Sequence, residues 1–199
     1  MDFRNAKELL KVCQEQGLSI SAVMLQRELT EGEQDPEETD RKMDRVLEIM
    51  KSAASTPIHT PVKSMGGLIG GEAKKISDHK DTGKGLCGDL LERAVIYAMA
   101  TLETNASMGL IVASPTAGSA GIVPGLLLAL QETYDLSDEQ IKQGLYNASA
   151  IGYLAMRNAT VAGAVGGCQA EVGFAPAMAA SATVELMGGS PEQSLAAAS

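Results

Sequence analysis

A long uncharged run constrains the fold of this chain more than any other feature of its sequence. It covers residues 104–131 and reads TNASMGLIVASPTAGSAGIVPGLLLALQ. A run of this length and apolar character could cross a membrane as one helix. Two prolines, four glycines and several hydroxyl groups interrupt it, and they would break the continuous helix that a crossing needs. We therefore expect the run to be buried inside a globular protein that has no membrane partner.

The rest of the composition favours an all-α fold in a single domain of 199 residues. Aromatic residues make up only 3% of the chain, whereas alanine and leucine, which favour helices, are common. Few segments alternate valine, isoleucine or threonine with the period of two that is typical of strands. The length is sufficient for one domain with a sizeable core.

Charge and cysteine usage exclude some partners and compartments. Residues 1–93 contain 14 of the 16 Lys and Arg residues, whereas residues 94–199 contain two cations and eight acidic residues. Neither part forms a basic stripe, so we expect no nucleic-acid partner. The three cysteines show no pairing pattern, and no secretory segment is evident, which predicts a reducing cytoplasm.

Three capping patterns mark helix starts, namely DPEE at 35–38, SDEQ at 137–140 and SPEQ at 190–193. The last pattern starts a helix close to Ser199. We therefore expect a domain that is truncated at its C-terminus, with a short frayed helix as the alternative. Capping and apolar periodicity together predict helices over 3–16, 19–31, 35–54, 88–106, 124–134, 137–157 and 175–187.

Glycine-rich segments separate these helices. Residues 55–85 and 159–174 are expected to form long irregular loops with a functional role, because loops of this length in compact domains are usually functional or disordered. A third glycine-rich loop is expected over residues 113–123.

The sequence SPTAGSAGIVPG is a candidate anion-binding loop. It places Ser114, Thr116 and Ser119 among glycines that include Gly118 and Gly121, directly before a predicted helix. Glycines let backbone N–H groups turn toward a ligand, and a helix N-terminus adds partial positive charge, which suits a small carboxylate. Close packing of helices at small residues is an alternative explanation of the same pattern.

Two other glycine-rich segments leave alternatives open. SMGGLIGGEAKK, residues 64–75, is either a similar binding loop or a mobile surface loop. AVGGCQAEVG contains Cys168, which is either a metal ligand or a small apolar residue.

The other candidate ligands do not select a metal. Cys13 lies on an amphipathic helix and is expected in the core. Cys87 lies at a helix start, where a thiolate is favoured, but packing is its expected role. His59 and His79 have no second ligand beside them.

Three segments closely resemble the alpha chain of the bacterial iron–sulfur-dependent L-serine dehydratases, in which alpha and beta chains are separate polypeptides. They are NASMGLIVASPTAGSAGIVPG (105–125), NATVAGAVGGCQAEVG (158–173) and MGGSPEQSLAA (187–197). FRNAKELL and MGGLIGGEAKK fit the same family, so the resemblance covers the whole chain. It implies a cytoplasmic, all-helical enzyme subunit that converts L-serine to pyruvate and ammonia and that forms an oligomer with a beta chain.

The resemblance also implies a 4Fe–4S cluster held by three cysteines, and no pyridoxal phosphate. Cys168 matches the first ligand, whereas Cys13 and Cys87 match none. The other two ligands are expected downstream, so these 199 residues alone are expected to hold no intact cluster and to be inactive. An open iron of the cluster would bind the serine hydroxyl as a Lewis acid. The base that removes the α-proton is expected from the beta chain and has no identified counterpart here.

With L-serine as the implied substrate, the candidate anion-binding loop is its expected binding site. Asn105 and Asn158, each ahead of a glycine motif, are expected to hydrogen-bond the substrate or the cluster, with helix capping as the alternative. Glu171 is expected to orient a loop or a nearby amide. The loop residues expected to bind substrate are Ser114, Thr116, Gly118, Ser119 and Gly121.

Two other functions stay open on the sequence. One is a non-catalytic helical binding or assembly module that retains the glycine loops. The other is a hydro-lyase for a different hydroxy amino acid, such as threonine. The enzyme hypothesis predicts that a longer chain carries two more cysteines.

Overall fold

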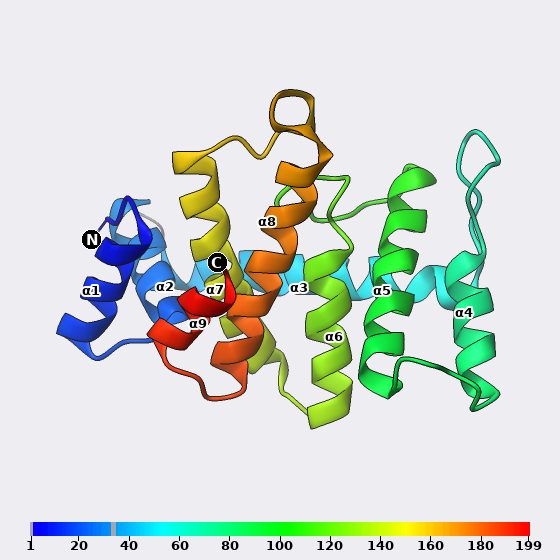
Figure 1. The fold of residues 1–199 in the computed structure, drawn as a ribbon, viewed down its shortest axis with the longest axis horizontal. Helices are drawn as coiled ribbons and strands as arrows, with labels where there is room; N and C mark the ends of the chain where they lie inside the picture. The colour runs from blue at the N-terminus through cyan, green and yellow to red at the C-terminus, as the bar shows by residue number, and fades with distance from the viewer. Residues whose placement is uncertain (1, 33–34) are drawn as a thin grey trace. The chain divides into compact units, whose positions relative to one another are not determined.

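The computed structural model describes residues 2–32 and 35–199, and all regular structure in these residues is helical (Figure 1). The all-α prediction is therefore confirmed. Two compact units are present: Met1–Arg45 with Ser137–Ser199 (unit 1), and Val46–Leu136 (unit 2). The helices are α1 (Ala6–Gln16), α2 (Ile20–Glu31), α3 (Pro36–His59), α4 (Glu72–Asp81), α5 (Asp89–Ala106), α6 (Ile122–Tyr134), α7 (Asp138–Asn158), α8 (Gly163–Leu186) and α9 (Pro191–Ala197).

Side-chain caps fix the starts of three helices where the sequence predicts them. Ser137 Oγ accepts a hydrogen bond from the Gln140 N–H at 3.2 Å, and the Gln140 side chain accepts one from the Ser137 N–H at 2.9 Å. The same reciprocal pair opens α9 at Ser190. Asp35 accepts a hydrogen bond from the first turn of α3 at 3.0 Å. Caps of this kind satisfy N–H groups that have no partner inside the helix.

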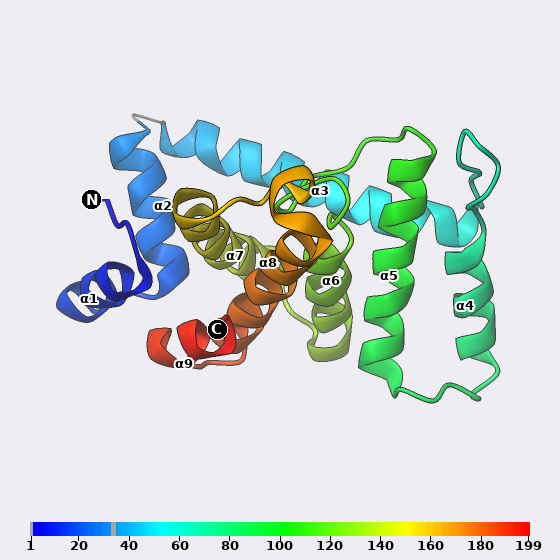
Figure 2. The same ribbon diagram turned by 45° about the horizontal axis from the view of Figure 1, so that its top comes forward.

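The core of unit 1 is built around α7, which packs against α2 and α8, while α9 packs against α8 and α1 (Figure 2). Full burial of aliphatic and aromatic side chains stabilises a fold by about 1.5–3 kcal/mol each. Cys13 belongs to this core, as predicted. Its buried members are Phe3, Leu9, Cys13, Ile20, Val23, Met24, Tyr146 and Ala150.

A carboxylate from one helix caps another in unit 1. Glu185 on α8 accepts hydrogen bonds from the Ile20 N–H at 3.1 Å and from the Asn147 side-chain amide at 2.7 Å. The negative charge lies at the positive end of α2, where it is favoured. This long-range contact fixes α2 against α7 and α8.

In unit 2, α5 packs against both α6 and α4. A Cβ atom at Gly121 would lie 2.5 Å from the carbonyl oxygen of Ala98, and one at Gly125 would lie 2.8 Å from that of Ala94. Neither position has room for a side chain, so these glycines allow α6 to approach α5 closely. The part of the uncharged run that forms α6 is largely buried, as predicted.

The prediction that residues 55–85 are irregular is wrong in two places. α3 continues through Pro57 to its end at His59, and α4 lies within the segment. Pro57 is buried, so tertiary packing stabilises a helical turn that proline disfavours in isolation. The first turn of α4 has its acceptor on α5, in the side chain of Glu103. Sequence spacing cannot reveal that contact.

The prediction that residues 159–174 are irregular is also wrong, because α8 begins at Gly163. The start of α8 consists mainly of glycine and alanine, and these residues give no apolar periodicity from which a helix could be recognised. Gly167 interrupts the helix with φ 75° and ψ 167°. α8 therefore has a short turn before Gly167 and a long regular helix after it.

No helix within the described ranges 2–32 and 35–199 has the combination of length and apolar character that crossing a membrane requires.

Candidate functional site

The candidate anion-binding loop lies between α5 and α6 in unit 2 (Figure 1). Ser114 and Ser119 are buried, whereas Thr116 is half-buried and Gly118 is exposed. The Ser119 and Thr116 hydroxyl groups are 3.0 Å apart, and Ser119 Oγ also donates to the Ser114 carbonyl oxygen at 3.4 Å. The loop hydroxyls thus bond to one another and to the loop backbone, which fixes the shape of the loop.

Two features of this loop bear on anion binding. Gly121 is the N-cap of α6 and provides no capping side chain, and the Ile122 N–H donates to the Ser119 carbonyl oxygen of the loop at 3.2 Å. Thr116 and Gly118 give the loop a partly accessible face. Gly121 itself is explained by packing against Ala98. The close-packing alternative therefore accounts for that glycine, while the accessible loop residues stay candidates for substrate binding.

Asn105 lies at the end of α5 and holds the same loop. Its side-chain amide donates a hydrogen bond to the carbonyl oxygen of Ala117 at 3.1 Å. The loop is thereby connected to α5 at its middle as well as at its end. The observed contact makes Asn105 a support of the candidate site, and direct contact with substrate stays a prediction.

The segment 64–75 is an ordered turn followed by the start of α4. The Ser64 N–H donates to the Ile69 carbonyl oxygen at 2.8 Å, and Ser64 Oγ accepts from the Ile69 N–H at 3.1 Å. Glu72 accepts a hydrogen bond from the Gly70 N–H at 2.6 Å. That N–H holds the pKa of the Glu72 carboxyl group below its usual value. These contacts give the turn a defined shape.

Cys168 follows the interruption of α8 in unit 1. Because Gly167 is not helical, Cys168 opens the long regular part of the helix, and its thiol is exposed. The thiolate is the form of cysteine that binds metals. The structure leaves Cys168 exposed, which gives a metal access to it.

Two other predicted residues lie near the start of α8 or the end of α7. A Cβ atom at Gly163 would be 2.6 Å from a carboxylate oxygen of Glu171, so Glu171 lies directly against the first turn of α8. This position agrees with a role in orienting that turn. Asn158 donates to the carbonyl oxygens of Arg4 at 2.8 Å and Leu154 at 2.9 Å. It thereby supports the end of α7 and the N-terminal segment.

The remaining cysteines and histidines do not complete a metal site. Within residues 2–32 and 35–199, no three His, Cys, Asp or Glu side chains are grouped closely enough to hold a metal ion. Burial raises the pKa of the Cys13 thiol to about 11, which keeps it neutral. Cys87 is exposed and belongs to unit 2. The described residues alone therefore do not fit an iron–sulfur cluster with three cysteine ligands.

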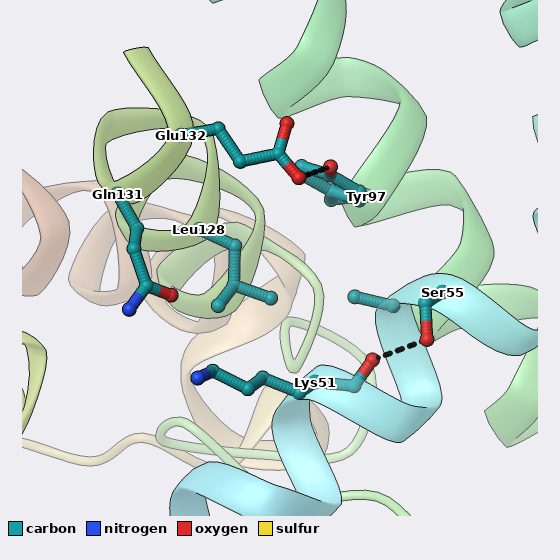
Figure 3. Close-up of a pocket in the computed structure, with 7 residues that line it drawn as sticks. Lys51, Ser55, Tyr97, Leu128, Gln131 and Glu132 are labelled. Atoms are coloured by element: carbon teal, nitrogen blue, oxygen red, sulfur yellow. Dashed lines mark hydrogen bonds between the residues drawn. The ribbon is translucent and has the colours of Figure 1, made fainter. Parts of the chain in front are cut away.

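A cavity of about 290 Å³ in unit 2, with both polar and apolar lining, contains residues that sequence reasoning missed (Figure 3). Figure 3 shows the Tyr97 hydroxyl group directed at Glu132, to which it donates a hydrogen bond. Arg93 bonds to the other oxygen of Glu132. Burial, followed by the hydrogen bond to Glu132, raises the pKa of Tyr97. The Glu132 carboxylate in this cavity is already bound by Tyr97 and Arg93, which makes the cavity a poorer candidate for a substrate site than the glycine loop.

The described residues form an all-helical fold with a hydroxyl-rich glycine loop before one helix and an exposed cysteine in another. The family described as "Serine dehydratase alpha chain" matches residues 15–199, and the chain belongs to this family.

Relatives support the same assignment over nearly the whole chain. The "Probable L-serine dehydratase, alpha chain" of Bacillus subtilis (strain 168) is 46% identical over 192 residues, which are 96% of this chain and 64% of that protein. The "L-serine dehydratase, alpha chain" of Peptoniphilus asaccharolyticus is 42% identical over 197 residues, covering 99% and 68%. "L-serine dehydratase TdcG" of Escherichia coli (strain K12) is 34% identical, and the match covers 43% of its length. The chain thus spans only part of these relatives.

Proposed function

We propose that this chain is the alpha part of an L-serine ammonia-lyase that converts L-serine to pyruvate and ammonia. The observation that supports this proposal best is the similarity, at 46% and 42% identity, to two proteins named as L-serine dehydratase alpha chains. The loop before α6 supports it from the chemical side, because a helix N-terminus next to hydroxyl groups suits the carboxylate of an amino acid.

The proposed reaction removes the α-proton and the β-hydroxyl group of L-serine as water. The product is aminoacrylate, which tautomerises to the imine of pyruvate. One water molecule then hydrolyses the imine and releases ammonia, so the net products are pyruvate and ammonium. The partner for this reaction is a beta chain, which the alpha-chain names of the relatives imply, and a beta-chain group is proposed as the base.

In this proposal the chain's own residues bind and orient the substrate. The carboxylate of L-serine would lie at the start of α6, against the accessible side of the loop at Thr116 and Gly118. Asn105 keeps the loop in place through its contact with Ala117. Fixing the substrate relative to the reacting groups can lower the barrier by several kcal/mol.

We also propose Cys168 as one thiolate ligand of the iron–sulfur cluster that the family resemblance implies. Its exposed position at a helix start suits this role. The proposal requires that further ligands come from outside residues 1–199, because the described residues contain no group of three candidate ligands. A cytoplasmic location and an oligomeric state are parts of the same proposal.

The test is to purify the complete alpha chain with its beta chain without oxygen, supply ferrous iron and sulfide, and measure pyruvate formed from L-serine. We expect steady pyruvate formation, with ammonia released in equal amount. L-Threonine is assayed in parallel through its 2-oxobutanoate product. If kcat/KM is higher for threonine than for serine, threonine is the preferred substrate and the assignment to serine is wrong. If the iron-loaded pair releases ammonia from neither amino acid, the enzyme proposal is wrong and the non-catalytic module remains.

A further inference from the structure

Glu103, near the end of α5, has a buried carboxyl group with an unusual contact. Its side chain is 1% exposed, and Oε1 accepts a hydrogen bond from the Ala73 N–H at 2.8 Å. Ala73 lies in the first turn of α4, whose N-cap, Gly71, provides no side-chain cap. A residue of α5 therefore caps α4. Burying a carboxyl group is unfavourable unless its contacts compensate, which suggests that this contact has a role beyond filling space.

The second carboxylate oxygen strengthens this point. Oε2 of Glu103 is buried and receives no hydrogen bond from the described residues, and the Glu72 carboxyl group is a further neighbour. An apolar residue of similar size would avoid leaving a polar atom without a donor. The hydrogen bond to Ala73 is the contact that such a residue could not make.

The contact with Ala73 lies at the base of the glycine-rich turn, residues 61–71. Within this turn, Ser64 and Ile69 bond to each other, and Glu72 accepts from the Gly70 N–H. A Cβ atom at Gly70 would lie only 2.1 Å from the Val62 carbonyl oxygen, so the two ends of the turn touch. These contacts close the turn on itself and join it to the first residue of α4.

The tip of the turn contributes little to holding it in place. Met65 and Leu68 are 83% and 91% exposed. Since the tip buries almost no apolar surface, its position depends on the base. At the base, Glu103 adds a hydrogen bond from the first turn of α4 to the packing of α4 against α5.

The end of α5 holds a second glycine segment in the same way. Asn105, two residues after Glu103, bonds to Ala117 in the loop between α5 and α6. Figure 1 shows the turn before α4 and this loop at the same end of unit 2, on either side of the C-terminal end of α5. One helix end thus sets the positions of both glycine segments.

We propose that Glu103 is a positioning residue that fixes the turn at 61–71 relative to the substrate loop. The effect on catalysis rests on the proposed function, whereas the contact between Glu103 and the turn does not. We expect the turn to lie beside the bound substrate without contacting its carboxylate. Loss of Glu103 should therefore lower kcat more than it raises KM.

The direct test is amide hydrogen exchange, followed by mass spectrometry of peptides, on the complete chain. In Glu103→Ala, exchange over residues 61–73 should become at least tenfold faster, while peptides from α6 and from unit 1 keep their rates. Glu103→Gln retains the acceptor oxygen and should exchange like the wild type. Glu103→Asp shortens the side chain by one methylene group, so its exchange rate over residues 61–73 should lie between those of the wild type and Glu103→Ala. This variant takes the place of Glu103→Ala if the alanine variant does not fold.

Thr101→Val is the matched control. Thr101 is also buried on α5, and its hydroxyl donates to the Tyr97 carbonyl oxygen at 2.9 Å, away from both glycine segments. It should leave exchange over 61–73 unchanged. A uniform rise in exchange across unit 2 in Glu103→Ala, or unchanged exchange over 61–73, would overturn the positioning role.

Kinetics of the reconstituted pair give the second readout. Glu103→Ala should lower kcat at least tenfold with KM within threefold, and Glu103→Gln should recover most of the loss. If Glu103→Ala speeds up exchange only over residues 61–73 and leaves kcat unchanged, Glu103 holds the turn but has no role in catalysis. A wild-type pair that does not act on serine would reject the proposed function, and the exchange result would still decide whether Glu103 holds the turn.

Discussion

The side-chain amide of Asn105 donates a hydrogen bond to the carbonyl oxygen of Ala117, with 3.1 Å between the two atoms. The two residues lie at the end of α5 and in the middle of the loop that leads to α6. Glycine-rich backbone has much conformational entropy to lose when it is ordered. A single side chain that joins the middle of such a loop to a helix therefore restricts the loop strongly.

Replacing Asn105 with alanine should weaken binding of L-serine. Without the bond to Ala117 the loop samples more conformations, and only a fraction of them present the N-terminus of α6 to the substrate carboxylate. We expect KM for serine to rise about tenfold, equivalent to about 1.4 kcal/mol, while kcat changes less than threefold. Steady-state kinetics of the reconstituted pair measure both constants.

Thr133→Val provides the comparison for Asn105→Ala. The Thr133 hydroxyl donates to the Ala129 carbonyl oxygen within α6 at 2.7 Å, and it does not touch the loop. This variant should keep the wild-type KM. An unchanged KM in Asn105→Ala would show that the contact with Ala117 does not shape the binding site.

Gly121→Ala should destabilise unit 2. The new Cβ atom would lie 2.5 Å from the Ala98 carbonyl oxygen, which belongs to the backbone and cannot rotate away. Overpacking of this kind typically costs about 1–3 kcal/mol. Gly66→Ala, where no heavy atom lies within 4 Å of the added Cβ, should change stability by about 0.5 kcal/mol or less. Urea denaturation of the two variants gives the comparison, and equal stabilities would contradict the close contact of α5 and α6.

Local signals in the sequence were sufficient for much of the fold. The capping pairs at Ser137 and Ser190 act over three residues, so the sequence contains all that is needed to recognise them. The burial of α6 follows from its uncharged sequence. The core position of Cys13 follows from its place on an amphipathic helix.

The missed elements depend on contacts between distant residues. The first turn of α4 donates a hydrogen bond to the Glu103 side chain, 30 residues further along the chain. No spacing rule connects Glu103 with Ala73, and a lone glutamate in a helix gives no sign of being buried. Likewise, the first turns of α8 consist of glycine and alanine, whose helical state is set by packing and not by pattern.

Sequence and resemblance together propose the loop at 114–125 and Cys168 as site residues. The packing of Gly121 against Ala98 agrees with the close-packing alternative that the sequence left open. The sequence did not indicate that Asn105 holds the loop through a backbone carbonyl oxygen. Such roles depend on the direction of a side chain and on the distance to another helix, which a single sequence does not contain.

Cys13 should make the stability of the chain depend on pH in the alkaline range. Burial raises the pKa of its thiol to about 11 in the folded protein, above the value in the unfolded chain. The folded state therefore holds the proton more tightly, and its contribution to stability is complete below pH 8 and is lost as the pH rises toward 11. We expect Cys13 to account for on the order of 1–2 kcal/mol of this loss.

The measurement is the free energy of unfolding by urea at pH 7 and pH 10.5 under reducing conditions. Other groups also titrate in this range, so the difference between wild type and Cys13→Ala isolates the thiol. The variant should lose less stability than the wild type between the two pH values. Cys87→Ala removes an exposed thiol and should lose as much stability as the wild type between the two pH values. Equal losses in all three proteins would show that the Cys13 thiol is not held neutral by burial.

Cys168→Ala should abolish formation of pyruvate by the reconstituted pair. The thiol is exposed at the start of the long part of α8, so its removal takes away a proposed iron ligand without disturbing the core. Iron bound per chain should fall in parallel, while the urea midpoint of the metal-free chain stays at the wild-type value. Cys87→Ala, the other exposed cysteine, should retain both iron and activity, and Cys13→Ala should retain most of its activity despite some loss of stability. Activity that survives in Cys168→Ala would remove this residue from the proposed centre. Activity lost with iron content intact would make Cys168 necessary for a reason other than binding iron.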